Sequence, residues 1–184
     1  MIETVAEHSL ETLRPNALVL DLGCIGFEFT NEMRRRGHRV SCVDIQELEG
    51  DYDRVGITDY DGVGWILKSP DRQATQLKKG MGTTMAYRVD CQTLLTYSRS
   101  KNRVFWDLIK MDIEGSELEV IHSLDVPPAR QLSIEFHLHT KVYDQEQVGF
   151  MVDKLTQLGY KTVQHDMTSQ HGCGYNYWDS LFVL

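Results

Sequence analysis

The sequence predicts a doubly wound α/β fold, in which helices cover both faces of a mostly parallel sheet. Two observations carry this prediction. Short apolar runs typical of buried parallel strands alternate with segments of helical periodicity. The last two strand-like runs, residues 160–165 and 177–184, have only a loop between them, which indicates an antiparallel strand at one edge of the sheet. A length of 184 residues fits a single domain spanning residues 1–184.

The first elements follow from apolar spacing and helix-ending residues. We expect a short N-terminal helix within residues 1–15, because apolar residues recur there at loosely helical spacing and Pro15 would end it. Residues 17–20 and 40–43 predict two strands. Residues 27–36 predict the helix between these strands, since a glycine follows directly.

The remaining elements continue the alternation. We expect residues 64–84 to be a mobile surface segment, because most of this stretch is polar and contains glycines. Ser116 with Glu119, and Asp144 with Gln147, have the spacing of a capping box and predict the start of a helix at each place. Further strands are predicted at residues 85–89, 105–111 and 132–138.

The composition excludes several classes of partner. The formal net charge is −8, so nucleic acid and anionic membranes would repel the chain, and we expect neither as a partner. The sequence has no run of about 18 apolar residues, and its N-terminus lacks the pattern of a secretory signal. The four cysteines match no metal motif and no disulfide scaffold. We interpret them as reduced thiols of a cytoplasmic protein.

Glycines and a carboxylate follow the first two predicted strands, at the sheet edge where ligands bind in such folds. The first strand leads into Asp21-Leu22-Gly23-Cys24-Ile25-Gly26, and glycines there let the backbone approach a ligand. The second strand ends at Asp44, where a carboxylate can bind the hydroxyls of a ribose. Each feature alone is also compatible with a tight turn or a cap at Gln46. Together they indicate an adenosine-containing ligand, without separating NAD from S-adenosylmethionine.

Two later segments place polar side chains at the same edge. Asp112 and Glu114 would project to one side as the chain leaves its strand. On the following strand, Glu135, His137 and His139 share one face, which is unusual for a central parallel strand. The polar face therefore needs partners, and the two carboxylates of the neighbouring strand would supply them. The alternatives are an acidic helix N-terminus and a solvated edge strand.

Residues 107–121, which contain Asp112-Ile113-Glu114-Gly115, resemble the signature of the FkbM-type methyltransferases. Residues 19–24 are similar to the first motif of class I methyltransferases, and residues 55–62, 134–137 and 177–184 resemble other segments of the family. This resemblance implies a seven-stranded sheet with the last strand antiparallel. It also implies S-adenosylmethionine as methyl donor and a hydroxyl oxygen as acceptor. Family members usually carry a second glycine where this chain has Phe27.

The resemblance also implies the cofactor-binding residues. The first glycine loop would line the methionine and ribose side, Asp44 would hold the ribose hydroxyls, Asp90 would lie near the adenine, and Asp112 would lie close to the reacting methyl. With the neighbouring positions included, the predicted cofactor-binding set is Asp21, Gly23, Cys24, Gly26, Asp44, Ile45, Asp90 and Asp112.

Methyl transfer to an alcohol requires a group that removes the proton. The candidate catalytic residues are Asp112, Glu135, His137 and His139, and His137 is the first choice because imidazole titrates near neutrality. The same side chains could instead hold a divalent cation that orients a diol, although we assign no metal ligand. The expected acceptor is a carbohydrate or a small metabolite, and a homodimer would provide one way of covering it.

Two other function classes stay open. An NAD-linked oxidoreductase requires a G-x-G-x-x-G loop, and Ile25 stands where the middle glycine would be. A non-catalytic module that binds adenosine or S-adenosylmethionine would keep the fold with a degraded site, and Phe27 is the feature that favours it.

Overall fold

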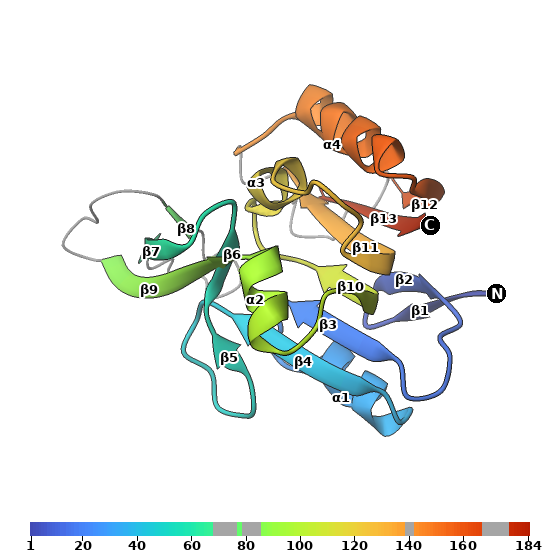
Figure 1. Cartoon of the computed structure of the whole chain (residues 1–184), viewed down its shortest axis with the longest axis horizontal. Helices are drawn as coiled ribbons and strands as arrows, with labels where there is room; N and C mark the ends of the chain where they lie inside the picture. The colour runs from blue at the N-terminus through green and yellow to red at the C-terminus, as the bar shows by residue number, and fades with distance from the viewer. Residues whose placement is uncertain (68–76, 79–85, 139–141, 167–176) are drawn as a thin grey trace.

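A seven-stranded sheet forms the centre of the molecule (Figure 1). The computed structural model describes residues 1–67, 77–78, 86–138, 142–166 and 177–184. Within the sheet, β13 alone runs antiparallel to its neighbours, which are β11 and the outermost strand β12. The predicted mostly parallel sheet with an antiparallel strand at one edge is thus confirmed. In spatial order the strands are β12 (Lys161–Asp166), β13 (Tyr177–Val183), β11 (Ala129–His137), β10 (Trp106–Met111), β3 (Leu18–Leu22), β4 (Arg39–Asp44) and β5 (Asp53–Arg54).

The two faces of this sheet are covered by different elements. Alternate residues of β3 and β10 point to opposite faces, so Leu20 and Ile109 join one apolar cluster while Val19 and Leu108 join another. The first cluster includes residues of α2 (Leu94–Ser100), α3 (Glu117–His122) and α4 (Gln145–Gln157). The second includes residues of α1 (Glu28–Arg35) and of the N-terminal segment. Helices therefore lie on both faces, as predicted.

The predicted N-terminal helix within residues 1–15 is wrong. This segment forms a β-hairpin of β1 (Ile2–Val5) and β2 (His8–Glu11), in which Val5 pairs with His8. Both turn residues between the strands, Ala6 and Glu7, have positive φ angles of 44° and 72°. Such a turn normally requires glycine or asparagine, so the sequence carried no signal for it. The buried Val5 and Leu10 complete the cluster on the α1 face of the sheet.

A second, four-stranded sheet lies beside the central one. Its spatial order is β6 (Gly56–Thr58), β9 (Ala86–Thr93), β7 (Gly62–Leu67) and β8 (Leu77–Lys78). Within the segment 64–84, which we predicted to be mobile, residues 64–67 and 77–78 form strands, because β7 pairs with both β9 and β8. Residues 68–76 and 79–84 lie outside the described residues.

The sequence predicts the start of α4 correctly, whereas the start of α3 is stabilised by a different residue from the one predicted. In α4, Asp144 and Gln147 form the predicted capping box. At α3, Ser116 makes no side-chain capping hydrogen bond. The carboxylate of Glu117 instead accepts hydrogen bonds from the backbone N–H groups of Ile113 (3.1 Å) and Gly115 (2.8 Å). Among the described helices, none is both long and apolar enough to cross a membrane.

Candidate functional site

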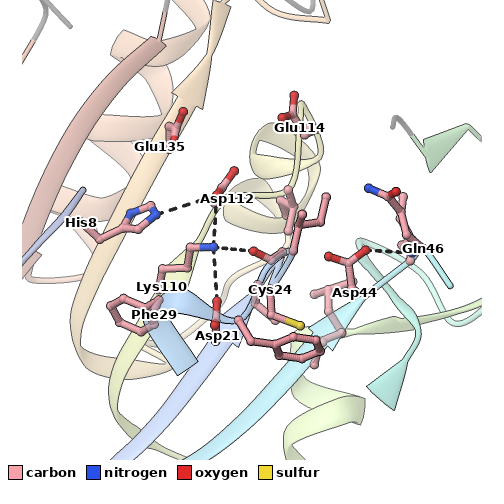
Figure 2. Close-up of a pocket in the computed structure, with 18 of the residues that line it drawn as sticks. His8, Asp21, Cys24, Phe29, Asp44, Gln46, Lys110, Asp112, Glu114 and Glu135 are labelled. Carbon is pink, nitrogen blue, oxygen red and sulfur yellow. Dashed lines mark hydrogen bonds and ion pairs between the residues drawn. The ribbon is translucent and has the colours of Figure 1, made fainter. Parts of the chain in front are cut away.

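A cavity of about 330 Å³ opens at the carboxyl ends of β3, β4 and β10 (Figure 2). It has two ends on either side of Asp112: Asp44 and Gln46 lie at one end, and His8 and Glu135 lie at the other. Of the residues predicted to form the site, the following line the cavity: Asp21, Gly23, Cys24, Asp44, Ile45, Asp112 and Glu135.

Four predicted site residues are not among the residues that line this cavity. Asp90 is exposed on β9, where it pairs with Val63 in the second sheet, and its place near an adenine stays a prediction. Gly26 shapes the loop instead of lining the cavity. His137 is buried behind Asp112. His139 lies outside the described residues.

The loop after β3 is held by a close backbone contact. Gly23 has a φ angle of +80°, and a Cβ atom there would lie 1.7 Å from the backbone oxygen of Asp112. Only glycine fits this position, so the loop and the end of β10 touch directly. Asp21 is buried and accepts a hydrogen bond of 2.6 Å from the hydroxyl of Thr30 on α1. The contact and this hydrogen bond fix the floor of the cavity.

The departure from the family's glycine pattern is visible in the same loop. Gly26 has a φ angle of +77°, and Phe27 follows with a φ angle of +58°, which is unusual for a residue with a side chain. The Phe27 ring lines the cavity and makes an edge contact with Tyr52, with the ring centroids 6.2 Å apart. Phe27 therefore takes the left-handed conformation that a glycine would adopt more easily, and adds an aromatic wall.

Asp44 occupies the position predicted for a ribose-binding carboxylate. It is 5% exposed, at the end of β4, and its Oδ1 accepts a hydrogen bond of 2.8 Å from the backbone N–H of Gln46. Burial raises the pKa of Asp44, and the hydrogen bond from Gln46 partly opposes this. The adjacent wall is apolar and consists of Ile45, Val55 and Ile57, which suits the flat face of a nucleobase.

A buried lysine joins the strand ends. Lys110 projects from β10, and its Nζ lies 3.2 Å from Asp21 Oδ1 and 3.1 Å from Asp112 Oδ2 (Figure 2). It also donates to the backbone oxygen of Gly23. Burial alone would lower the pKa of Lys110, but Asp112 and Asp21 outweigh this and raise it, so the ammonium stays charged. Lys110 thereby holds both carboxylates in place.

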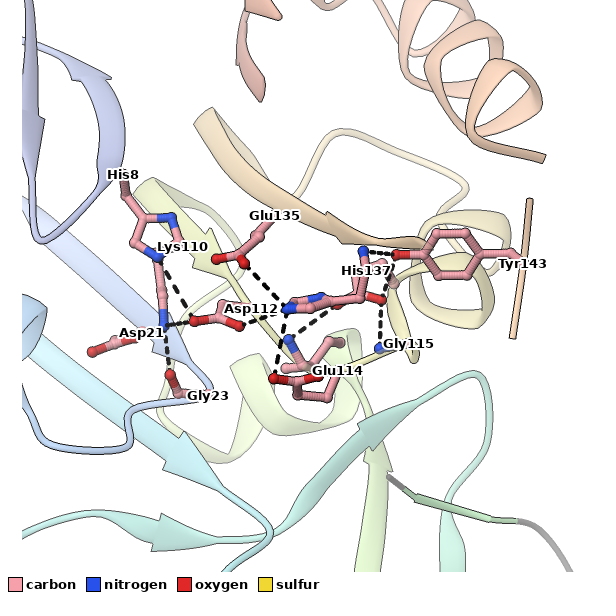
Figure 3. Close-up of polar contacts among 12 residues, drawn as sticks. His8, Asp21, Gly23, Lys110, Asp112, Glu114, Gly115, Glu135, His137 and Tyr143 are labelled. Carbon is pink, nitrogen blue, oxygen red and sulfur yellow. Dashed lines mark hydrogen bonds and ion pairs between the residues drawn. The ribbon is translucent and has the colours of Figure 1, made fainter. Parts of the chain in front are cut away.

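His137 is the centre of a second polar network (Figure 3). Its Nδ1 lies 2.8 Å from Glu117 Oε1, and its Nε2 lies 3.2 Å from Asp112 Oδ1. Glu117 is fully buried and also accepts a hydrogen bond of 3.0 Å from the Tyr143 hydroxyl. Burial alone would lower the pKa of His137, but Glu117 and Asp112 raise it well above the usual value. The raised pKa favours the charged form of His137, and both ring nitrogens face carboxylates, so this arrangement does not favour His137 as the proton acceptor, a role that stays a prediction.

The end of the cavity around Glu135 is acidic. Glu135 projects from β11 with its side chain 16% exposed, and its Oε1 lies 3.4 Å from His137 Nε2. Burial, followed by the charge of Asp112, raises the pKa of Glu135 to about 8. Glu7 and Glu114 line the same cavity. The raised pKa favours the protonated form of Glu135 near neutral pH, and in that form Glu135 can donate a hydrogen bond.

Two sets of side chains have the spacing of metal ligands. Candidate ligand atoms of His8, Asp112 and Glu135 lie within 4.8 Å of one another, as do those of Asp112, Glu114 and His137. Both sets share Asp112, whose two oxygens already face the cationic Lys110 and His137. A divalent cation here would lie beside two positive groups, so the donor set does not favour one.

Sequence reasoning missed three residues that shape the cavity. Lys110 carried a signal, because a lysine inside an otherwise apolar strand needs buried counter-charges. Phe27 was noted as a departure but not as part of the wall. His8 had no signal, because its place depends on the hairpin that the sequence did not predict.

Comparisons with known proteins identify one family and several similar structures. The sequence model of one protein family, described as the methyltransferase FkbM domain, matches residues 21–162. Among curated proteins, none matches this sequence. The structure is similar to that of magnesium protoporphyrin IX methyltransferase from Synechocystis PCC 6803 with bound SAM, at 15% identity and a TM-score of 0.46, covering 92% of this chain and 70% of that one. A SAM-dependent methyltransferase from Methanosarcina mazei is similar at 12% identity and a TM-score of 0.48, covering 93% of both chains.

Proposed function

Because the chain belongs to the methyltransferase FkbM domain family, we propose that it transfers the methyl group of S-adenosylmethionine to a hydroxyl oxygen of a small, neutral acceptor such as a carbohydrate. The observation that carries this proposal is the two-ended cavity. The buried Asp44 and the apolar wall at one end suit an adenosine, while the polar end around Glu135 suits a hydroxylated acceptor. Asp112 lies between the two ends, where the methyl would pass.

Within this proposal the protein acts mainly by positioning. S-adenosylmethionine, when bound, supplies an electrophilic methyl group on a sulfonium. Asp44 would accept hydrogen bonds from the ribose hydroxyls, and the Gly23 loop would hold the methionine part. Glu135, protonated near neutrality, would donate a hydrogen bond to the acceptor. Holding two reactants in line can contribute about 7–11 kcal/mol to lowering a barrier.

The charges at the acceptor end restrict the acceptor. The carboxylates of Glu7, Glu114 and Asp112 line the cavity beside Glu135, whose raised pKa favours the neutral form. The described lining residues contain one lysine, Lys110, which is engaged with carboxylates. An anionic acceptor such as a sugar phosphate would be repelled at this end. A neutral polyol, whose hydroxyl groups donate hydrogen bonds to carboxylates, is the acceptor class that the lining favours.

Calorimetry with three ligands tests the donor. We expect S-adenosylmethionine and S-adenosylhomocysteine to bind and NAD not to bind. The variant D44A should lose about 1.5–3 kcal/mol of binding free energy, because hydrogen bonds from the ribose hydroxyls to a carboxylate would be absent. The control E47A changes an exposed carboxylate on the same loop and should bind like wild type. A protein that binds neither sulfur ligand would contradict the methyltransferase proposal.

Transfer itself is tested with radiolabelled S-adenosylmethionine and a panel of neutral sugars and polyols, with the matching sugar phosphates as controls. We expect label in neutral acceptors and little in the phosphates. The second candidate function is the non-catalytic binding module. The observation that favours it is Phe27, which takes a positive φ angle where family members usually carry a glycine. Tight binding of the donor without transfer to any panel member would favour that module.

A further inference from the structure

We propose that His8, carried by the N-terminal hairpin, is the group that takes the proton from the acceptor hydroxyl during methyl transfer. This inference rests on the proposed function and adds a catalytic residue to it. His8 lies outside residues 21–162, the part of the chain that matches the family. The hairpin would thus complete a site whose cofactor-binding part belongs to the family core.

The hairpin holds His8 at the cavity from two sides. On the sheet side, the backbone N–H of Glu11 donates to Gln131 Oε1 on β11 (2.8 Å), and Gln131 Nε2 donates back to the Glu11 oxygen (3.3 Å). On the helix side, the His8 ring makes an edge contact with Phe29 of α1, with centroids 5.8 Å apart and an interplanar angle of 84°. His8 is 4% exposed and lines the cavity beside Asp112 and Glu135 (Figure 3).

The hydrogen bonding of His8 leaves its ring available. Its Nδ1 has no hydrogen-bond partner among the described residues. Its Nε2 lies 3.8 Å from Asp112 Oδ2, which is beyond hydrogen-bond distance but within the range of an ion pair once the ring is protonated. His137, by contrast, has both ring nitrogens engaged with Glu117 and Asp112 and does not line the cavity. Of the two imidazoles near Asp112, His8 is the one that an acceptor can reach.

The titratable groups around His8 also support His8, and not His137, as the proton acceptor. From β10 and its end come Lys110 and Asp112, which form an ion pair with each other, and from β11 comes Glu135. From α1, Phe29 presents an apolar edge. Asp112 has Lys110 and His137 as cationic partners, so its charge is balanced without His8. Burial, followed by the charge of Asp112, raises the pKa of Glu135 to about 8, which favours its protonated form near neutral pH and leaves less of the carboxylate to accept a proton. Imidazole is the side chain most often used as a general base.

The proposed step is balanced. The acceptor oxygen forms its bond to the methyl carbon while the carbon–sulfur bond breaks, and that electron pair stays on sulfur to give S-adenosylhomocysteine. The hydroxyl proton passes to His8 Nε2, which lies toward Asp112, another residue that lines the cavity. The resulting imidazolium later releases this proton to water, and no oxidant or further reactant is needed.

The test compares H8Q and H8F with wild type on the acceptor that wild type methylates best. H8F keeps an aromatic ring against Phe29, and thermal melts show whether each variant folds. We expect donor affinity close to wild type and a kcat lowered roughly 100- to 10,000-fold. In both variants the decrease of kcat on the acidic side of the pH profile should disappear. In a third variant, H8A, imidazole added to the solution should restore part of the activity. The control H122Q changes an exposed histidine on α3 and should behave like wild type.

A second measurement does not require an acceptor. Diethyl pyrocarbonate reacts with imidazole nitrogens that have an available lone pair, and mass spectrometry locates the product. We expect His8 to be modified and His137 to stay unmodified. Donor binding with unchanged kcat and pH profile in folded H8Q and H8F, or modification of His137 instead of His8, would overturn the assignment of His8 while leaving the proposed function intact. Absence of donor binding in wild type would instead overturn the proposed function.

Discussion

Gly23 shows how one residue can be dictated by its neighbours. Its Cβ position lies 1.7 Å from the backbone oxygen of Asp112, so a side chain would require the loop and β10 to separate. Gly37 has a similar φ angle of +83°, but its Cβ position has no neighbouring atom within 4 Å. Replacing each of these glycines with alanine therefore distinguishes the cost of a left-handed backbone, which both positions share, from the cost of a steric clash, which only Gly23 has.

We expect G37A to lower the free energy of unfolding by about 1–2 kcal/mol, which is the cost of a left-handed conformation for a residue with a Cβ. G23A should cost several times as much and should abolish donor binding, because the backbone contact cannot relax cheaply. Urea denaturation and calorimetry measure both effects. Equal losses in the two variants would show that the contact at Gly23 is unimportant.

His137 should affect stability in a pH-dependent way. Its folded-state pKa is raised, so its stabilising effect is complete below about pH 6.5 and is lost as the pH rises through that raised pKa. H137Q leaves Glu117 buried without its charged partner, and we expect a loss of roughly 3–5 kcal/mol at pH 6. The loss should shrink as the pH increases above 6.5.

Denaturation of wild type and H137Q at a series of pH values measures this dependence. H122Q is the matched control, since His122 is exposed, and its difference from wild type should not vary with pH. A difference for H137Q that grows with increasing pH would contradict the assignment of His137 as a charged structural partner.

At the scale of single elements, α4 contains an exposed glycine with no structural role. A Cβ at Gly149 would meet no atom within 4 Å, and the residue lies inside a helix of 13 residues. We expect G149A to raise the free energy of unfolding by about 1 kcal/mol, because alanine restricts the unfolded chain and favours the helix. Thermal and urea denaturation would detect this, and a loss of stability would contradict the helix as described.

The sequence predicted those elements whose signals are local. The caps of α4 and the apolar runs of β3 and β10 act through neighbouring residues, so pattern and spacing suffice. The unusual polar face of β11 also predicted its contact with Asp112, because a buried polar strand needs partners on the adjacent strand. The carboxyl-end rule then brought Asp21, Asp44 and Asp112 to one cavity.

Elements that depend on distant pairing were not predictable. The N-terminal hairpin turns at Ala6 and Glu7, which have no preference for the positive φ angles they adopt. The parallel pair of β6 and β9 brings Gly56 beside Cys91, far apart in the chain. For this reason neither the place of His8 in the cavity nor that of Asp90 on the second, four-stranded sheet could be predicted from the sequence.

At the scale of the whole molecule, the hairpin is part of the core. Leu10 is 1% exposed and packs with Phe29 and Met33 of α1, while Leu155 is fully buried on the opposite face of the sheet. We expect L10A and L155A each to lower the free energy of unfolding by roughly 2–5 kcal/mol. A near-neutral L10A beside a destabilised L155A would show that the hairpin is only loosely attached.

The position of Cys24 has a practical consequence. The thiol lines the cavity yet is 2% exposed, and its contact with Cys42 together with burial raises its pKa, so it is a poor nucleophile while the loop is closed. Its rate of labelling by a maleimide therefore reports how often the loop opens. Cys91, buried in the second sheet, is an internal reference. A bound ligand that slows labelling at Cys24 but not at Cys91 would show that the ligand binds in this cavity, without any assay of turnover.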